Sequence, residues 1–204
     1  MKKEVSIKIP EKWSDVSLKT YQDYSSKIDD LTNEDEIVLH SIASLCEVPL
    51  DVIKMLKVTD IKTIYLKLAE LISIPVNKEI FYKIKINGVK YGFHPCLDEM
   101  TLGEFVDIEE NAKDGILSFH KVMSVLYRPI IEEEGSKYKI EPYEASHMDN
   151  AKLFQETNID TINGVMLFFY NLGNRLLSSS KGYLQAMAVL QNLQREGVTD
   201  GLPS

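Results

Sequence analysis

The sequence predicts an α+β fold that is predominantly α-helical, with one or two β-hairpins and a short N-terminal strand. Three observations favour this class. An Asn-Gly pair separates two alternating apolar segments in the middle of the chain, and apolar residues recur at helical spacing before and after it. With 204 residues and 44% apolar content, the chain can bury a core without metals or disulfides.

The first expected element is a short strand at the N-terminus. Val5, Ile7 and Ile9 alternate with polar residues before Pro10. This period of two is typical of a strand that has one face on a core. Such a strand at an edge is open to strand addition, so the three apolar residues are candidates for a partner interface.

The part from residue 11 to 76 is expected to be helical. Ser17 and Thr32 can each cap a helix, because their hydroxyls can accept hydrogen bonds from free backbone N–H groups. The apolar spacing after Thr32 predicts a helix that continues to Val48, just before Pro49. Shorter helices follow up to the end of this part.

The middle part, residues 77–145, contains the hairpins. Phe81–Ile86 and Val89–Phe93 alternate on either side of Asn87-Gly88, whose two residues tolerate the positive φ angles of a type I′ turn. A second hairpin is predicted between residues 130 and 143, turning near a Glu-Gly-Ser segment. The second hairpin could pair with the first.

Two helices are predicted between the hairpins. Thr101 and Glu104 form a capping box for the first helix. The expected buried side of that helix consists of Leu102, Phe105, Val106 and Ile108. The second helix is predicted over Ile116–Tyr127 and is expected to stop at Arg128-Pro129, because the residue before a proline disfavours helical backbone.

The C-terminal part is expected to be helical over residues 146–196 and to end in a polar tail, 197–204. One helix is apolar on all sides around Phe168, Phe169 and Tyr170, so it must be buried in the core or against a partner. A last amphipathic helix carries Leu184, Met187 and Leu190. All six residues are candidates for a partner interface, and the whole chain, 1–204, is expected to form one domain.

Composition disfavours several classes of protein. The net charge of −8 opposes direct binding of nucleic acid. No segment approaches the roughly 20 apolar residues that span a bilayer, and no apolar signal-peptide core follows the basic start, so no membrane contact is expected. Cys46 and Cys96 lie far apart and suit a reducing cytoplasm.

The motifs of common enzymes are missing from the sequence. It contains neither a phosphate-binding glycine loop nor paired histidines at metal-ligand spacing, so no catalytic, cofactor-binding or metal-binding residue is assigned and no cofactor is expected. His94 and Cys96 could form half a metal site or an activated cysteine, or they could simply flank the end of a strand. Six acidic residues around the capped helix could bind a cation or perform acid-base chemistry, or they could be ordinary first-turn and solvent-face acids: Asp98, Glu99, Glu104, Asp107, Glu109 and Glu110.

Arg128 is singled out as a further interface candidate. A guanidinium that follows an apolar helix and precedes a proline can hold a carboxylate in a fixed, bidentate geometry. That carboxylate could belong to a partner chain or to this chain, and the apolar surroundings favour the internal salt bridge.

Five phrases resemble a family of small proteins encoded in the structural and tail-assembly gene neighbourhoods of tailed bacteriophages. In chain order they are KIPEKWSDVSLKTYQDY, INGVKYGFHPCLDEMTLGEFVDIE, KVMSVLYRPI, KYKIEPY and NGVMLFFYNLG. The bias towards Lys, Ile, Asn and Glu also fits an AT-rich genome, such as that of a crAss-like phage. The family has no established catalytic residues to transfer to this sequence.

The resemblance implies a non-enzymatic virion protein, such as a ring or connector subunit of the neck or tail. Its partners would be other structural proteins of the phage (portal, neck or tail components) and copies of itself in a homo-oligomer. It would be made in the host bacterial cytoplasm and found in the virion. The alternative is a tail-assembly chaperone or scaffold that is absent from the mature particle; an enzyme that uses His94 or the acidic residues is a third hypothesis.

Overall fold

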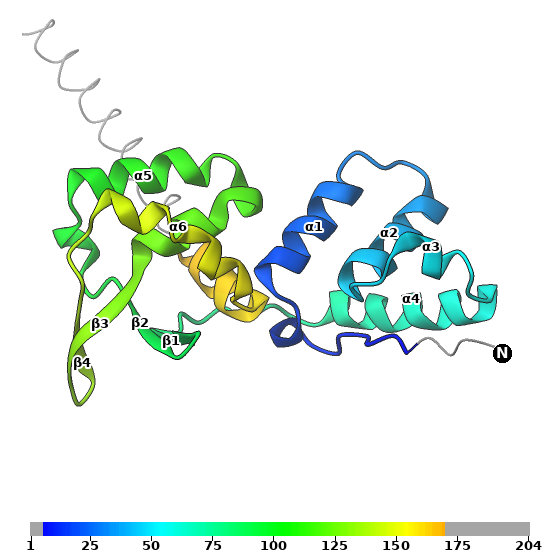
Figure 1. The fold of residues 1–204 in the computed structure, drawn as a ribbon, viewed down its shortest axis with the longest axis horizontal. Helices are drawn as coiled ribbons and strands as arrows, with labels where there is room; N and C mark the ends of the chain where they lie inside the picture. Colours follow the sequence, from blue (N-terminus) through cyan, green and yellow to red (C-terminus); the bar gives the residue numbers. More distant parts are fainter. Residues whose placement is uncertain (1–5, 170–204) are drawn as a thin grey trace, which may run out of the picture. The chain divides into compact units, whose positions relative to one another are not determined.

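A computed structural model describes residues 6–169 of the chain (Figure 1). The chain divides into two compact units, Met1–Gly164 and Val165–Ser204. The predicted class is confirmed: the fold is α+β, mostly helical, with one small antiparallel sheet of four strands. The expectation of one domain stays a prediction, because only residues 165–169 of the second unit are described.

The N-terminal part of the first unit is a set of four helices. They are α1 (Leu18–Ile28), α2 (Glu34–Leu45), α3 (Leu50–Ile53) and α4 (Val58–Ser73). Helix α2 packs against the other three, and its Ile42 is fully buried with Leu18 of α1 and Leu68 of α4. The predicted cap of α1 is confirmed, since Thr20 donates its backbone N–H to Ser17 Oγ at 3.1 Å.

Helix α2 differs from its prediction at both ends. Its cap is Asn33 and not Thr32, because the Asn33 side chain accepts hydrogen bonds from two backbone N–H groups of the first turn. The helix ends at Leu45, before Val48, because Glu47 adopts a positive φ of 53°. Thr20 Oγ1 donates to Glu47 Oε1 at 2.6 Å, and this contact holds the turn against α1.

The predicted N-terminal strand is wrong for the residues that the structure describes. Ile7 and Ile9 are half-buried, whereas Ser6 and Lys8 are exposed, so the alternation is present as burial. The segment Ser6–Pro10 nevertheless pairs with none of the four strands, and its main chain makes no hydrogen bond to another described residue. Pro10 also lacks the backbone N–H group that would donate a hydrogen bond to a neighbouring strand. Val5 lies outside the described residues.

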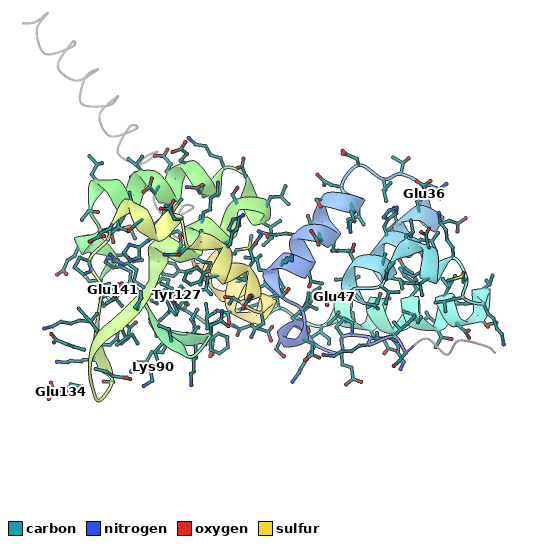
Figure 2. All side chains as sticks on the ribbon, viewed as in Figure 1. Glu36, Glu47, Lys90, Tyr127, Glu134 and Glu141 are labelled. Carbon is teal, nitrogen blue, oxygen red and sulfur yellow. The ribbon has the colours of Figure 1, made fainter. Side chains whose placement is uncertain are left out.

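Both predicted hairpins are confirmed, and they pair with one another. The strands are β1 (Lys83–Ile86), β2 (Val89–Phe93), β3 (Tyr127–Glu134) and β4 (Lys137–Ile140), in that order across the sheet. Asn87 and Gly88 have φ angles of 48° and 85°, as a type I′ turn requires. Gly135 turns the second hairpin, and Figure 2 labels Glu134 at its tip.

Helices α5 (Leu102–Ala112) and α6 (Phe119–Leu126) connect β2 to β3. The second helix was predicted to begin at Ile116, but Gly115–Ser118 forms a 3₁₀ turn before it. Strand β3 begins directly after α6, so Arg128-Pro129 lies within a strand, where Arg128 is opposite Gly92. Tyr127, labelled in Figure 2, is buried and donates its hydroxyl to the carbonyl oxygen of Phe81.

Backbone and side-chain contacts join the N-terminal helices to the sheet part within the first unit. Leu18 N donates to the Thr157 carbonyl at 2.8 Å, and Ile159 N donates to the Val16 carbonyl at 2.9 Å. From α1, Gln22 Nε2 donates to the carbonyl of Ile116 at 2.8 Å. A further helix begins at Ile159 and continues to residue 169, the last one described.

A substitution at Gly92 tests the packing of Tyr138 from β4 across strand β2. A Cβ atom at this position would lie 2.4 Å from the Tyr138 ring, which crosses the strand, whereas a Cβ at Gly103 on α5 has nothing within 3.9 Å. We expect Gly92→Ala to lower the free energy of unfolding by about 1–3 kcal/mol, as overpacking does. Gly103→Ala is the matched control and should cause no loss. Equal urea midpoints for the two variants would contradict this account of the β2–β4 contact.

Candidate functional site

Helix α5 carries the candidate site, and its two faces are the reverse of the predicted ones. Ile108 is buried as expected, but the other buried residues of the helix are polar, Glu104 and Asn111. The remaining three predicted core residues are exposed: Leu102 by 78%, Phe105 by 53% and Val106 by 46%. Two of the three buried residues of the helix are therefore polar, and three large apolar residues face solvent.

The inner face is organised by the Glu104 carboxylate, which is only 2% exposed. Its Oε2 atom accepts hydrogen bonds from the backbone N–H and the hydroxyl of Thr101, at 2.6 and 2.8 Å. This confirms the predicted capping box. Its Oε1 atom lies 2.7 Å from Arg128 Nη2 and 3.5 Å from His94 Nε2. One carboxylate thus serves the helix cap and a buried ion pair.

The cluster joins four separate segments of the chain. His94 follows β2, Arg128 lies in β3, Glu104 lies in α5, and Tyr143 follows β4. The Arg128 guanidinium stands 5.8 Å from the centre of the Tyr143 ring, and the Tyr143 hydroxyl donates to Asp107 of α5. His94 N also donates to the Leu126 carbonyl at 2.8 Å. The residues in β3 and directly after β2 and β4 are therefore joined to α5 through one ion pair and polar contacts.

The protonation states follow from burial and charge. Burial favours the neutral form of His94 and lowers its pKa, although the nearby Glu104 carboxylate opposes this shift. Burial alone would raise the pKa of Glu104. The hydrogen bonds from Thr101 and the charge of Arg128 outweigh burial, so the pKa of Glu104 lies below its ordinary value. At neutral pH the cluster is a carboxylate-guanidinium pair beside a neutral imidazole.

The positions of His94 and of the acidic residues bear on two hypotheses from the sequence. One is a metal or cysteine site at His94 and Cys96, and the other is a cation or acid-base site at the acidic residues. Glu104 is a buried structural acid and not a solvent-face one, whereas Asp98, Glu99, Glu109 and Glu110 are exposed. None of His94, Glu104 and Arg128 lines either of the two cavities of about 640 and about 520 Å³. Within residues 6–169, no group of three or more His, Cys, Asp or Glu side chains could hold a metal ion.

The outer face of α5 is a small apolar stripe with acidic residues around it. Leu102, Phe105 and Val106 are spaced three and four residues apart, which places them on one side of the helix. We call these three residues the α5 stripe. Asp98, Glu109 and Glu110 lie close to it in sequence, and none of them forms a salt bridge with a described residue. The α5 stripe is therefore a candidate protein-binding surface.

The other interface candidates have different outcomes. Arg128 is 4% exposed and makes the internal salt bridge, so it offers no surface to a partner chain. Phe168 and Phe169 lie in the helix that begins at Ile159, are half-buried, and have ring centres 5.3 Å apart. The remaining candidates at the C-terminus lie outside the described residues: Tyr170, Leu184, Met187 and Leu190.

The α5 stripe was missed because its residues were assigned to the core by apolarity alone. A signal was present in the sequence: the Glu of a capping box and an Arg next to an apolar helix are natural partners for one another. When Glu104 is on the buried side, Leu102 lies about 200° away around the helix axis, because successive residues are about 100° apart around that axis. Recognising the pair of Glu104 and Arg128 in the sequence would have predicted that the three residues of the α5 stripe face solvent.

The comparisons with known proteins give no family for this chain. It matches no protein-family model, no curated protein and no solved structure. Among the described residues, no helix is both long and apolar enough to cross a membrane. Function is therefore inferred from the geometry of the chain itself.

Glu104→Gln tests the buried ion pair. The substitution keeps the shape of the side chain but leaves the Arg128 guanidinium buried without its counter-charge, which typically costs about 3–5 kcal/mol. We expect a loss of that size in the free energy of unfolding, measured by denaturant titration. Glu109→Gln, on the exposed side of the same helix, is the control and should change it by less than about 0.5 kcal/mol. Similar losses in both variants would contradict the role assigned to Glu104.

His94 makes the stability depend on pH. Because its pKa is lowered in the folded chain, the unfolded chain binds a proton first, and acid favours unfolding. The stabilisation is complete above the ordinary His pKa of about 6.5 and is lost as pH falls below it. His120 is shifted in the same direction and contributes in the same range. We therefore expect His94→Gln to reduce, not abolish, the loss of stability between about pH 7 and 5. An unchanged slope would contradict this.

Proposed function

We propose that this chain is a structural subunit of a tailed-phage particle, of the ring or connector type found in the neck or tail, and that it works by binding other proteins without catalysis. The observation that carries the protein-binding part of the proposal is the α5 stripe, three large apolar side chains turned to solvent from a well-anchored helix. Burying such a stripe against a partner removes apolar surface from water, which drives association.

The charge around the stripe specifies the partner. Acidic side chains surround it, so a fitting partner surface is apolar at its centre and carries Lys or Arg at its rim. A symmetric pair of α5 stripes would bring acidic residues together and be repelled. We therefore assign the α5 stripe to a different protein, a portal, neck or tail component of the particle.

The buried cluster supports this use of α5. A helix that presents an interface must hold its side chains in place, and Glu104 fixes α5 through its cap and through Arg128 at the same time. Such anchoring reduces the conformational entropy that binding would otherwise cost. The phage assignment itself comes from the resemblance in the sequence, with which an interface of this kind agrees.

The α5 stripe can be tested in the particle. A phage that lacks this gene would be complemented with wild-type chain, Phe105→Ser or Leu66→Ser. Leu66 on α4 is the matched control, because it is 56% exposed and lies on a different helix. We expect wild type and Leu66→Ser in purified particles at a fixed ratio to the major capsid protein, and Phe105→Ser strongly depleted. Quantitative mass spectrometry measures the ratio, and circular dichroism checks that each variant folds.

Two outcomes would overturn parts of the proposal. If wild-type chain occurs in infected cells but not in mature particles, the chain is an assembly chaperone or scaffold. If Phe105→Ser enters particles as well as wild type, the α5 stripe is not the binding surface.

A further inference from the structure

Strand β1 has an open edge. Within residues 6–169 it is the first strand of the sheet and pairs only with β2. Phe93 N donates to the Tyr82 carbonyl at 2.8 Å, so these two residues form a hydrogen-bonded pair of the hairpin. Hydrogen-bonded and non-hydrogen-bonded pairs alternate along an antiparallel ladder, so the N–H and C=O groups of Lys83 and Lys85 point away from β2. They make no hydrogen bond to the rest of the described chain outside the hairpin.

A groove runs along this open edge. It is a cavity of about 520 Å³, and one wall includes the consecutive residues Lys83 to Asn87. A wall made by one face of a strand would contain alternate residues, so an unbroken run indicates that the strand edge faces the cavity. The other wall includes Glu156, Thr157 and Asp160, and the buried Thr157 hydroxyl has no hydrogen-bond partner among the described residues.

The same chain contains a segment that fits this groove and has no strand partner of its own. Ser6–Ile9 has the alternation of a strand, and its main-chain groups are unpaired within residues 6–169. It is four residues long, as is β1. Paired with β1, its two isoleucines would extend the apolar side of the strand that carries Ile84 and Ile86. Lys8 would lie on the opposite face, on the side of Lys83 and Lys85.

The segment is held away from the β1 edge of its own chain. Lys8 and Pro10 line a different cavity, together with Leu45 and Glu47 at the end of α2. Pro10 and Trp13 are buried, and Trp13 Nε1 donates to the Ile74 carbonyl at 3.4 Å. Reaching the chain's own groove would require releasing both anchors, whereas the β1 edge of a second copy can meet the exposed side of Ser6–Ile9 with Pro10 and Trp13 still in place.

We infer that the β1 edge binds the N-terminal segment, Ser6–Ile9, of a second copy of this chain as an added strand. The segment that is added and the β1 edge that receives it are different surfaces of the chain, so every copy can use both. Contacts of this heterologous kind propagate from copy to copy and close into a ring when the rotation allows it. The inference adds self-association to the proposed function, uses none of the α5 stripe, and does not depend on the phage assignment.

Disulfide trapping between two purified single-cysteine variants tests the contact. Lys8→Cys is mixed with Lys85→Cys in the Cys96→Ser background, under mild oxidation. All three positions are at least partly exposed, so folding should be kept. Cys46 is replaced by Ala as well, because it lines the same cavity as Lys8 and a cysteine at position 8 could form an internal disulfide with it. Lys139→Cys, on β4 at the opposite edge of the sheet, replaces Lys85→Cys in the control mixture.

We expect a disulfide-linked heterodimer from the Lys8→Cys and Lys85→Cys mixture and none from the control mixture. Equal linkage in both mixtures would reveal random collision and overturn the inference, and so would no linkage in either. A double variant, Lys8→Cys with Lys85→Cys, that forms only an internal disulfide would show that the segment binds its own edge instead. Linkage in solution by a chain that is absent from particles would leave this inference standing while the proposed function failed.

Discussion

The rest of the structure around the sheet depends on one buried carboxylate. Glu104 is required in two places at once, at the cap of α5 through Thr101 and against the guanidinium of Arg128 in β3. An isolated buried charge is strongly unfavourable, so neither partner can be satisfied unless α5 turns its polar side inward. The apolar stripe on the outside is the geometric consequence. A stabilising interaction inside the molecule thus determines which side chains the surface displays.

The sheet is held together by charge on its exposed side as well. Glu133 of β3 accepts from Lys83 of β1 and Lys90 of β2, at 2.8 and 2.9 Å, so one carboxylate links the two hairpins across their junction. These two lysines lower the pKa of Glu133 to about 2. The β1 edge itself takes no part in this network, since its unpaired groups belong to the main chain. The two proposed interfaces therefore use different chemistry, apolar side chains on α5 and backbone hydrogen bonds on β1.

Local signals predicted most elements of the fold, because a turn or a cap is decided by a few neighbouring residues. Asn87-Gly88 and the Thr101 capping box are of this kind. The errors arose where distant residues decide. Glu47 ends α2 through a contact with Thr20, and Arg128 determines which side of α5 is buried. Alternation in Ser6–Ile9 describes burial but says nothing about the presence of a neighbouring strand. The site was missed for the same reason, since apolarity alone does not distinguish a core from a binding surface.

The connection between β2 and β3 has a consequence for the order of folding. Each hairpin closes across a short turn, so it can form within microseconds. The central pairing of Gly92 with Arg128 encloses both α5 and α6, and closing so long a loop costs more entropy. We therefore expect the two hairpins to form before the central pairing, which awaits the helices between them. Until then β2 and β3 are both edges, and a chain emerging from the ribosome exposes them before Arg128 can meet Glu104.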